Sequence, residues 1–153
     1  MPLYFLDTSA VLKLYVQEIG SANMARLAAT PDVGFAISSL GLLEFRAAVR
    51  RRQRLEGLEP ELVESILEHF RQRAASALLR QVINDAVFDV AAILLDRHPL
   101  RALDSLQLAA CIILQQTMRD ISPVFTCSDA ALLKAASAEQ IPNWNPAAGE
   151  APG

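Results

Sequence analysis

Cysteine, long hydrophobic runs and an excess of basic charge are all scarce or missing in this chain of 153 residues. Its two cysteines, Cys111 and Cys127, lack the Cys-x-x-Cys or Cys/His spacing of a zinc or redox centre, so we expect buried free thiols. No apolar run approaches the roughly 18 residues that cross a bilayer. The N-terminus also lacks the basic flank and cleavage site of a secretory signal, and we therefore expect a cytoplasmic protein.

The net charge of −3 excludes a globally positive surface, so any nucleic-acid partner must be held by a local basic patch. Hydrophobic residues make up 52% of the chain and charged residues 20%, which is the balance of a compact fold and not of a disordered chain. A chain of this length can bury a full apolar core without disulfides. We expect one domain over residues 1–146 and a flexible tail over 147–153.

Short apolar segments alternate with stretches of helical periodicity along the chain. The predicted strands are 3–6, 34–37, a very short candidate at 82–83, 123–127 and a weak edge strand at 141–145. The predicted helices are 10–18, 21–29, 40–55, 61–79, 85–97, 102–118 and a last one that ends at 136. Strands separated by helices imply right-handed crossovers, and so predict a mainly parallel α/β sheet flanked by helices. Such sheets bind ligands at the carboxyl ends of their strands.

Four acidic residues lie near the starts of predicted helices, and three of them have a local structural explanation. Asp7 and Asp129 follow predicted strands, where aspartate often caps a helix by accepting hydrogen bonds from free backbone amides. Asp104 lies in the first turn of its helix, where the macrodipole favours an anion, and Arg101 precedes it by three residues. Glu44 differs, because no basic residue lies three or four positions away.

Considered together, the four acids have a second interpretation. In an alternating α/β chain they can converge on one edge of the sheet, and converging carboxylates require a counter-charge. Hard oxygen ligands in that number suit Mg²⁺ or Mn²⁺ and do not suit zinc, which usually takes His or Cys. A site of this kind is suited to phosphodiester hydrolysis.

Four short segments carry a more specific pattern when they are taken in chain order. They are Phe5-Leu6-Asp7-Thr8-Ser9-Ala10, Ser38-Ser39-Leu40 leading to Glu44, Arg101-Ala102-Leu103-Asp104-Ser105-Leu106-Gln107-Leu108-Ala109, and Phe125-Thr126-Cys127-Ser128-Asp129. With these segments the chain resembles the PIN-domain nucleases, and most closely the VapC-type toxins of bacterial and archaeal toxin–antitoxin pairs. It departs from them at Gln107, where many relatives have His, and at Cys127-Ser128, where an Ala or Ser is frequent before the last acid.

The resemblance implies a PIN-like, Rossmann-like parallel sheet and a metal-dependent ribonuclease. The matching acids, Asp7, Glu44, Asp104 and Asp129, would surround Mg²⁺ or Mn²⁺, and Thr8 or Ser9 would assist them. It also implies RNA as the substrate, a homodimer, and a cognate antitoxin whose C-terminal segment covers the active site.

Basic residues supply candidate contacts for RNA or for an acidic antitoxin segment. Arg46, Arg50 and Arg51, with Arg52 and Arg54, give one predicted helix a dense basic end. Arginines near a helix C-terminus are also favoured by the macrodipole, so a solvated helix end explains them equally well. Lys13 is a weaker candidate for a phosphate contact.

Two other functions remain open on the sequence. An aspartyl-phosphate phosphatase would use Asp7 as the nucleophile of an Asp-x-Asp motif, but Ser9 stands at the third position. A PIN-fold module that binds RNA or regulates a partner without cleaving anything would keep the fold and lack the activity.

Overall fold

The computed structural model describes residues 1–153 and contains one five-stranded sheet in the order β3-β2-β1-β4-β5. Its strands are β1 (Leu3–Leu6), β2 (Gly34–Ser38), β3 (Leu78–Gln81), β4 (Val124–Thr126) and β5 (Asn143–Trp144). Every neighbouring pair is parallel. The predicted parallel α/β class is therefore confirmed, with β5 at an edge as predicted. None of the helices combines the length and the apolar character needed to span a membrane.

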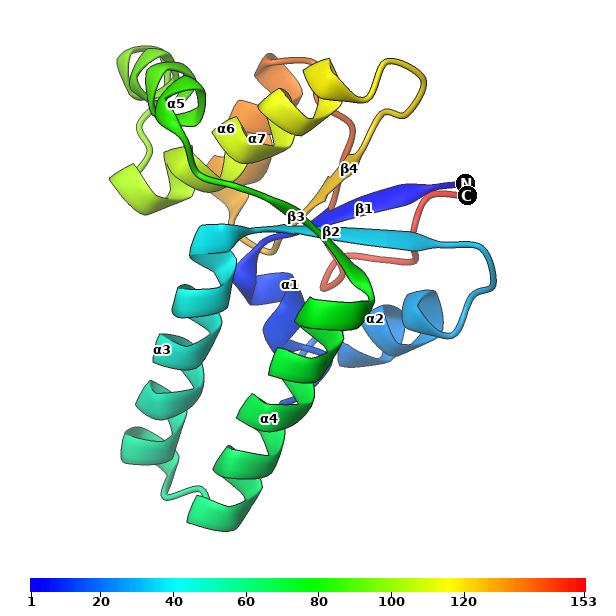
Figure 1. The fold of residues 1–153 in the computed structure, drawn as a ribbon, viewed down its shortest axis with the longest axis vertical. Helices are drawn as coiled ribbons and strands as arrows, with labels where there is room; N and C mark the ends of the chain where they lie inside the picture. The colour runs from blue at the N-terminus through cyan, green and yellow to red at the C-terminus, as the bar shows by residue number, and fades with distance from the viewer.

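Seven helices cover the two faces of the sheet (Figure 1). They are α1 (Thr8–Leu12), α2 (Ser21–Ala28), α3 (Ser39–Glu56), α4 (Pro60–Ser76), α5 (Asp85–Arg97), α6 (Ala102–Thr117) and α7 (Ala130–Ala138). In Figure 1, α5, α6 and α7 lie above the sheet, and α1 to α4 lie below it. The pair α3 and α4 forms a long hairpin that extends away from the sheet.

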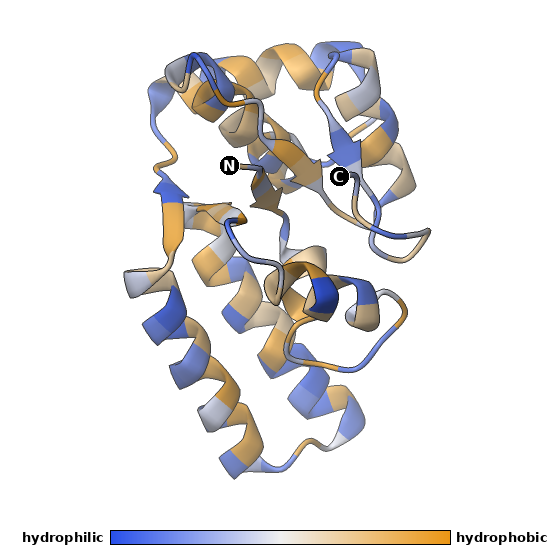
Figure 2. Cartoon of the chain, turned by 90° about the vertical axis from the view of Figure 1, so that its right-hand side faces the viewer, coloured by the Kyte–Doolittle hydropathy of each residue, from blue (hydrophilic) through white to orange (hydrophobic).

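The central strand β1 shows how the sequence builds two cores. All of its residues are buried, and they alternate between faces because successive side chains of a strand point to opposite sides. Leu3 and Phe5 belong to the core under α5–α7, whereas Tyr4 and Leu6 belong to the core under α1–α4. Figure 2 shows hydrophobic strand segments between the two helical layers. A strand buried on both faces reads as a continuous apolar run, which is why this one was visible in the sequence.

The predicted helix over 10–18 was wrong in its extent, because α1 ends at Leu12 and turns follow. The next side chains still point into the α1–α4 core, which explains the misleading periodicity. The ring of Tyr15 lies 5.2 Å from that of Phe45 and 6.0 Å from that of Phe70, measured between centroids. Packing against α3 and α4 therefore overrides local helix propensity in determining the path of the backbone here.

The strand predicted at 82–83 was also misplaced, and the helix predicted to end at 79 ends at Ser76. The edge strand β3 takes Leu78 and Leu79, which pair with Phe35 and Ala36 of β2. These leucines continue the apolar spacing of α4, so local periodicity assigned them to the helix. Pairing with a strand more than forty residues earlier is a long-range interaction that no local pattern reveals.

The C-terminal segment 147–153, predicted as a flexible tail, lies against the start of the chain in the structure. The indole N–H of Trp144 donates to the Gly149 carbonyl (3.1 Å), and the Tyr4 hydroxyl donates to the Pro152 carbonyl (2.6 Å). The two chain ends are close together in Figure 1. Trp144 thus anchors the C-terminal segment.

Candidate functional site

The four acids lie around the carboxyl edge of the sheet, at the point where the strand order reverses. Asp7 directly follows β1, and Asp129 precedes α7 after the neighbouring strand β4. The backbone N–H of Asp7 donates to the Thr126 carbonyl (3.0 Å), which extends the β1–β4 ladder to the acid itself. From β1 the sheet continues to β2 and β3 on one side, and from β4 to β5 on the other. A crevice at such a reversal is where open α/β sheets bind ligands.

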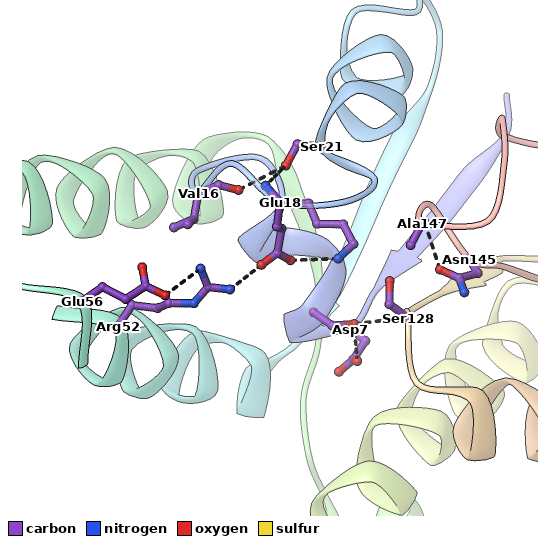
Figure 3. A network of polar contacts seen from close by, with 11 residues as sticks. Asp7, Val16, Glu18, Ser21, Arg52, Glu56, Ser128, Asn145 and Ala147 are labelled. Carbon is purple, nitrogen blue, oxygen red and sulfur yellow. Dashed lines mark hydrogen bonds and ion pairs between the residues drawn. The ribbon is translucent and has the colours of Figure 1, made fainter. Parts of the chain in front are cut away.

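Asp7 is held by a serine bridge and not by helix capping. It occupies the position before α1, yet its side chain makes no capping hydrogen bond. The Ser9 hydroxyl donates to Asp7 Oδ2 (3.0 Å) and accepts from the backbone N–H of Ser128 (3.1 Å). Figure 3 shows Asp7 beside Ser128. Asp7 thus occupies the cap position without the capping hydrogen bond that its place in the sequence predicted, and Ser9 connects the ends of β1 and β4.

Burial dominates the electrostatics of Asp7, whose side chain is 7% exposed. Burial raises the pKa of its carboxyl above the ordinary value. The Ser9 hydroxyl and the nearby amides of Thr8 and Ser9 lower that pKa in part, and the negative charge of Asp104 raises it. A carboxylate that is buried and repelled by a second carboxylate is stabilised by any cation that reaches it.

Glu44, in the second turn of α3, has a neutral partner. The Gln107 amide Nε2 donates to Glu44 Oε1 (2.9 Å). Burial raises the pKa of Glu44, the Gln107 hydrogen bond lowers it, and the charges of Asp7 and Asp104 raise it. Glu44, Asp7 and Asp104 therefore lie within electrostatic range of one another, although they come from three separate elements.

Asp104 and Asp129 keep the structural roles that their local sequence predicted. Asp104 Oδ2 accepts from Arg101 Nε (2.9 Å), and Asp129 Oδ1 caps α7 by accepting from the backbone N–H of Leu132 (2.8 Å). The hydrogen bond to Asp104 raises the pKa of the exposed Arg101 guanidinium, and the charges of Asp129 and Glu44 raise it further. Arg101 therefore senses the negative potential of three of the acids.

The side chains at this edge that could hold a metal ion are oxygen donors. Two buried hydroxyl oxygens, Thr8 Oγ1 and Ser128 Oγ, have no hydrogen-bond partner, and each adjoins a site acid in the sequence. Burial raises the pKa of the Cys127 thiol, with the charges of Asp7 and Asp129 adding to the effect, so that its sulfur stays protonated and is a poor ligand. No three His, Cys, Asp or Glu side chains form a ready-made ligand cluster. Mg²⁺ keeps several of its waters and needs few direct protein ligands, which suits oxygen donors that are near one another without converging.

Lys13, the predicted phosphate contact, is occupied inside the protein. It is 7% exposed, and its Nζ lies 2.8 Å from Glu18 Oε1. Arg52 binds the other oxygen of Glu18 and lies 3.3 Å from Glu56, and Figure 3 shows these ion pairs. Lys13 is therefore a structural partner of Glu18, and Arg52 links Glu18 to α3.

The other predicted basic contacts lie on α3 and face solvent to different degrees. Arg50 Nη2 pairs with Glu64 Oε1 of α4 (2.7 Å), whereas Arg46 and Arg51 are exposed and make no ion pair. Arg46 also lines a cavity of about 390 Å³ between α3, α4 and β3.

Gln107 and Ser38 are residues whose connection to the site the sequence did not reveal. In the sequence, Gln107 is a departure from the PIN-domain pattern, and Ser38 belongs to the Ser38-Ser39-Leu40 segment that leads to Glu44. Their contacts with Glu44 and with each other join positions 63 and 69 residues apart.

The raised pKa of Asp7 predicts an effect on the metal-free protein. The folded state holds this proton more tightly than the unfolded chain, so Asp7 favours folding most below its unfolded pKa, and this contribution is lost as pH rises through the folded pKa. Asp7→Asn should therefore stabilise the metal-free protein near neutral pH, because it removes a buried charge that disfavours the folded state there. Urea unfolding of both proteins from pH 4 to pH 7 in EDTA should show their difference growing with pH. A difference that does not change with pH would contradict the raised pKa.

Comparison with protein-family models and with curated proteins gives no match. Solved structures do match the fold over almost the whole chain, among them the following three. A chain of a toxin–antitoxin complex from Klebsiella pneumoniae is 17% identical with a TM-score of 0.60, covering 99% of this chain and 100% of its own. A chain of FitAB bound to an IR36 DNA fragment is 17% identical with a TM-score of 0.64, covering 97% and 98%. A chain of FitAcB from Neisseria gonorrhoeae is 17% identical with a TM-score of 0.63, covering 94% and 97%.

This chain has the fold of these three proteins. The predicted PIN-like architecture is thereby confirmed as a fold, a five-stranded parallel sheet between two helical layers.

Proposed function

We propose that the chain is a Mg²⁺- or Mn²⁺-dependent endoribonuclease, the toxin of a toxin–antitoxin pair. The observation that carries this proposal is the placement of four acids, three of which repel one another, with two unpartnered buried hydroxyls at the reversal point of the sheet. The shared fold with a chain of a toxin–antitoxin complex supports the toxin role. The choice of RNA as substrate rests on the resemblance to PIN-domain nucleases.

In this function Asp7, Glu44, Asp104 and Asp129 would hold the metal. A bound divalent ion lowers the pKa of a coordinated water and neutralises charge on the phosphate. Ser9 fixes the orientation of Asp7 through its hydroxyl, and the free hydroxyls of Thr8 and Ser128 can orient water at the edge of the site. Arg101, exposed at the rim, offers a cation to the RNA backbone.

The proposed protein partners are a cognate antitoxin and a second copy of the chain, in the cytoplasm. Exposed hydrophobic side chains support protein contacts on the β3 and α5 side, where Leu79, Val82 and Phe88 are each about half exposed. The cavity between α3 and α4 combines apolar walls with Arg46 and Arg80, which suits a segment bearing both apolar and acidic residues.

Purified protein, freed of bound partner by denaturation and refolding, should cleave RNA in the presence of Mg²⁺ or Mn²⁺ and stop when EDTA is added. Cleavage of a short fluorescently labelled RNA, compared with a DNA of the same sequence, provides the measurement. Folded, monodisperse protein that binds RNA and leaves it intact with either metal would contradict the nuclease and favour a PIN-fold binding module. The phosphatase is disfavoured because Ser9 stands where its second acid is required and is bonded to Asp7.

A further inference from the structure

Two linked hydrogen bonds, the first buried and the second partly buried, lead from the end of β2 to Glu44. The Ser38 hydroxyl donates to Gln107 Oε1 (2.8 Å), and Gln107 Nε2 donates to Glu44 Oε1 (2.9 Å). Ser38 is fully buried and Gln107 is 1% exposed. A long polar side chain so completely removed from water is costly unless its hydrogen bonds are made, and Gln107 makes one with each end of its amide.

The start of α3 fixes which groups donate and which accept in these two hydrogen bonds. Ser38 Oγ accepts from the backbone N–H of Gly41 (2.9 Å), so its own hydrogen is available for Gln107. A flipped amide would leave the hydroxyl facing an NH₂ group and would bring a carbonyl oxygen against the Glu44 carboxylate. The carboxylate accepts only, so the observed orientation is the one in which each contact pairs a donor with an acceptor.

Gln107 also connects the elements that carry two of the acids. It lies on α6 three residues after Asp104, so both side chains occupy one face of that helix, while its amide reaches Glu44 on α3. Movement of α3 against α6 would break the partly buried hydrogen bond between Gln107 and Glu44, and the spacing of the two acids is therefore tied to Gln107.

We propose that Gln107 is a positioning residue of the metal centre, which holds the Glu44 carboxylate in place by a donor whose direction Ser38 fixes. The proposal rests on the proposed metal site and adds a residue to it. Gln107 does not touch metal or substrate. It acts through Glu44, in the way that hydrogen-bond partners outside the ligand shell orient metal ligands in proteins.

The two hydrogen bonds of Gln107 predict which substitutions at this position preserve its role. Gln107→Leu removes both hydrogen bonds and leaves the carboxylate without its donor. Gln107→Glu has nearly the same shape but places a second carboxylate beside Glu44. Gln107→His restores the pattern, because a neutral imidazole has one acceptor nitrogen for Ser38 and one donor nitrogen for Glu44.

Calorimetric titration of Mn²⁺ into each purified full-length protein tests the proposal without relying on activity. Gln107→Leu and Gln107→Glu should each bind Mn²⁺ about 10- to 100-fold more weakly than the wild type, the usual effect of losing such a partner. Gln107→His should bind within a few-fold of the wild type. A purely structural role would make the histidine variant as poor as the other two, and that result would overturn the proposal, as would Gln107→Leu binding with wild-type affinity.

A wrong assignment of the metal site itself would give a titration result that differs from a wrong role for Gln107. Wild-type protein that binds no Mn²⁺, or Glu44→Gln protein that binds it as well as the wild type, would overturn the metal site at Glu44 and this inference with it. If Gln107→Leu fails to fold, as circular dichroism would show, the pair Gln107→Glu and Gln107→His carries the same comparison.

Discussion

Asp7→Asn should reduce metal-dependent RNA cleavage by about 10³-fold while leaving the protein folded. Asp7 is the most buried of the four acids, and its serine bridge gives it a fixed orientation. Asparagine keeps the shape and the hydrogen bond from Ser9 but removes the charge that a divalent ion would neutralise. The loss corresponds to about 4 kcal/mol of transition-state stabilisation, within the several kcal/mol that a bound metal supplies. Initial rates of cleavage of a labelled RNA at saturating Mg²⁺ provide the measurement.

A matched control is Asp96→Asn, which removes the same charge from an exposed position of α5. It should leave cleavage unchanged. The assignment of Asp7 fails if its asparagine variant cleaves at the wild-type rate, or if both variants lose activity together. The combination of lost activity with raised metal-free stability would be characteristic of a site residue, since removing a like charge relieves repulsion there.

Glu18→Gln should lower the free energy of unfolding by about 2 to 3 kcal/mol, equivalent to a fall in Tm of several degrees. Glu18 binds both Lys13 and Arg52, and Lys13 is 7% exposed, so the substitution leaves a buried ammonium without its counter-charge. Breaking a fully buried pair costs about 3 to 5 kcal/mol, and the smaller figure reflects the 21% exposure of Glu18. Urea unfolding at pH 7 followed by circular dichroism gives the free energy.

The matched control is Glu150→Gln, which breaks the ion pair with Arg26 on the surface, where the two side chains are 81% and 63% exposed. Such pairs contribute about 0 to 1 kcal/mol, so the change should be small. Equal effects of the two substitutions would show that burial does not strengthen the Glu18 network. A loss at Glu18 confined to that variant would confirm Lys13 as a structural residue and remove it from the list of phosphate contacts.

The parts of the fold that were predictable from the sequence are those set by local patterns. Strand β1 is apolar throughout because both its faces are buried, and α5 has a capping asparagine at 84 and a basic last turn, so its predicted bounds match the structure. The misplaced elements, α1 and β3, depend on packing with α3 and α4 or on pairing with β2, which are contacts between distant parts of the chain.

The same division holds for the candidate site. The four acids could be proposed from their order and from the resemblance that surrounds them, and Asp129 could be recognised as a helix cap. The serine bridge to Ser128 and the Gln107 chain could not, because each joins residues that only the folded sheet brings together. Glu44 had no local partner in the sequence, and its partner proves to be Gln107 on α6.

The location of bound Mn²⁺, measured by anomalous X-ray diffraction from crystals grown with the ion, tests the central claim most directly. The account predicts a peak at the carboxyl edge of β1 and β4, directly coordinated by Asp7 and by at least one of Glu44, Asp104 and Asp129. A peak elsewhere on the molecule, or no peak at this edge in crystals that hold the ion, would contradict it.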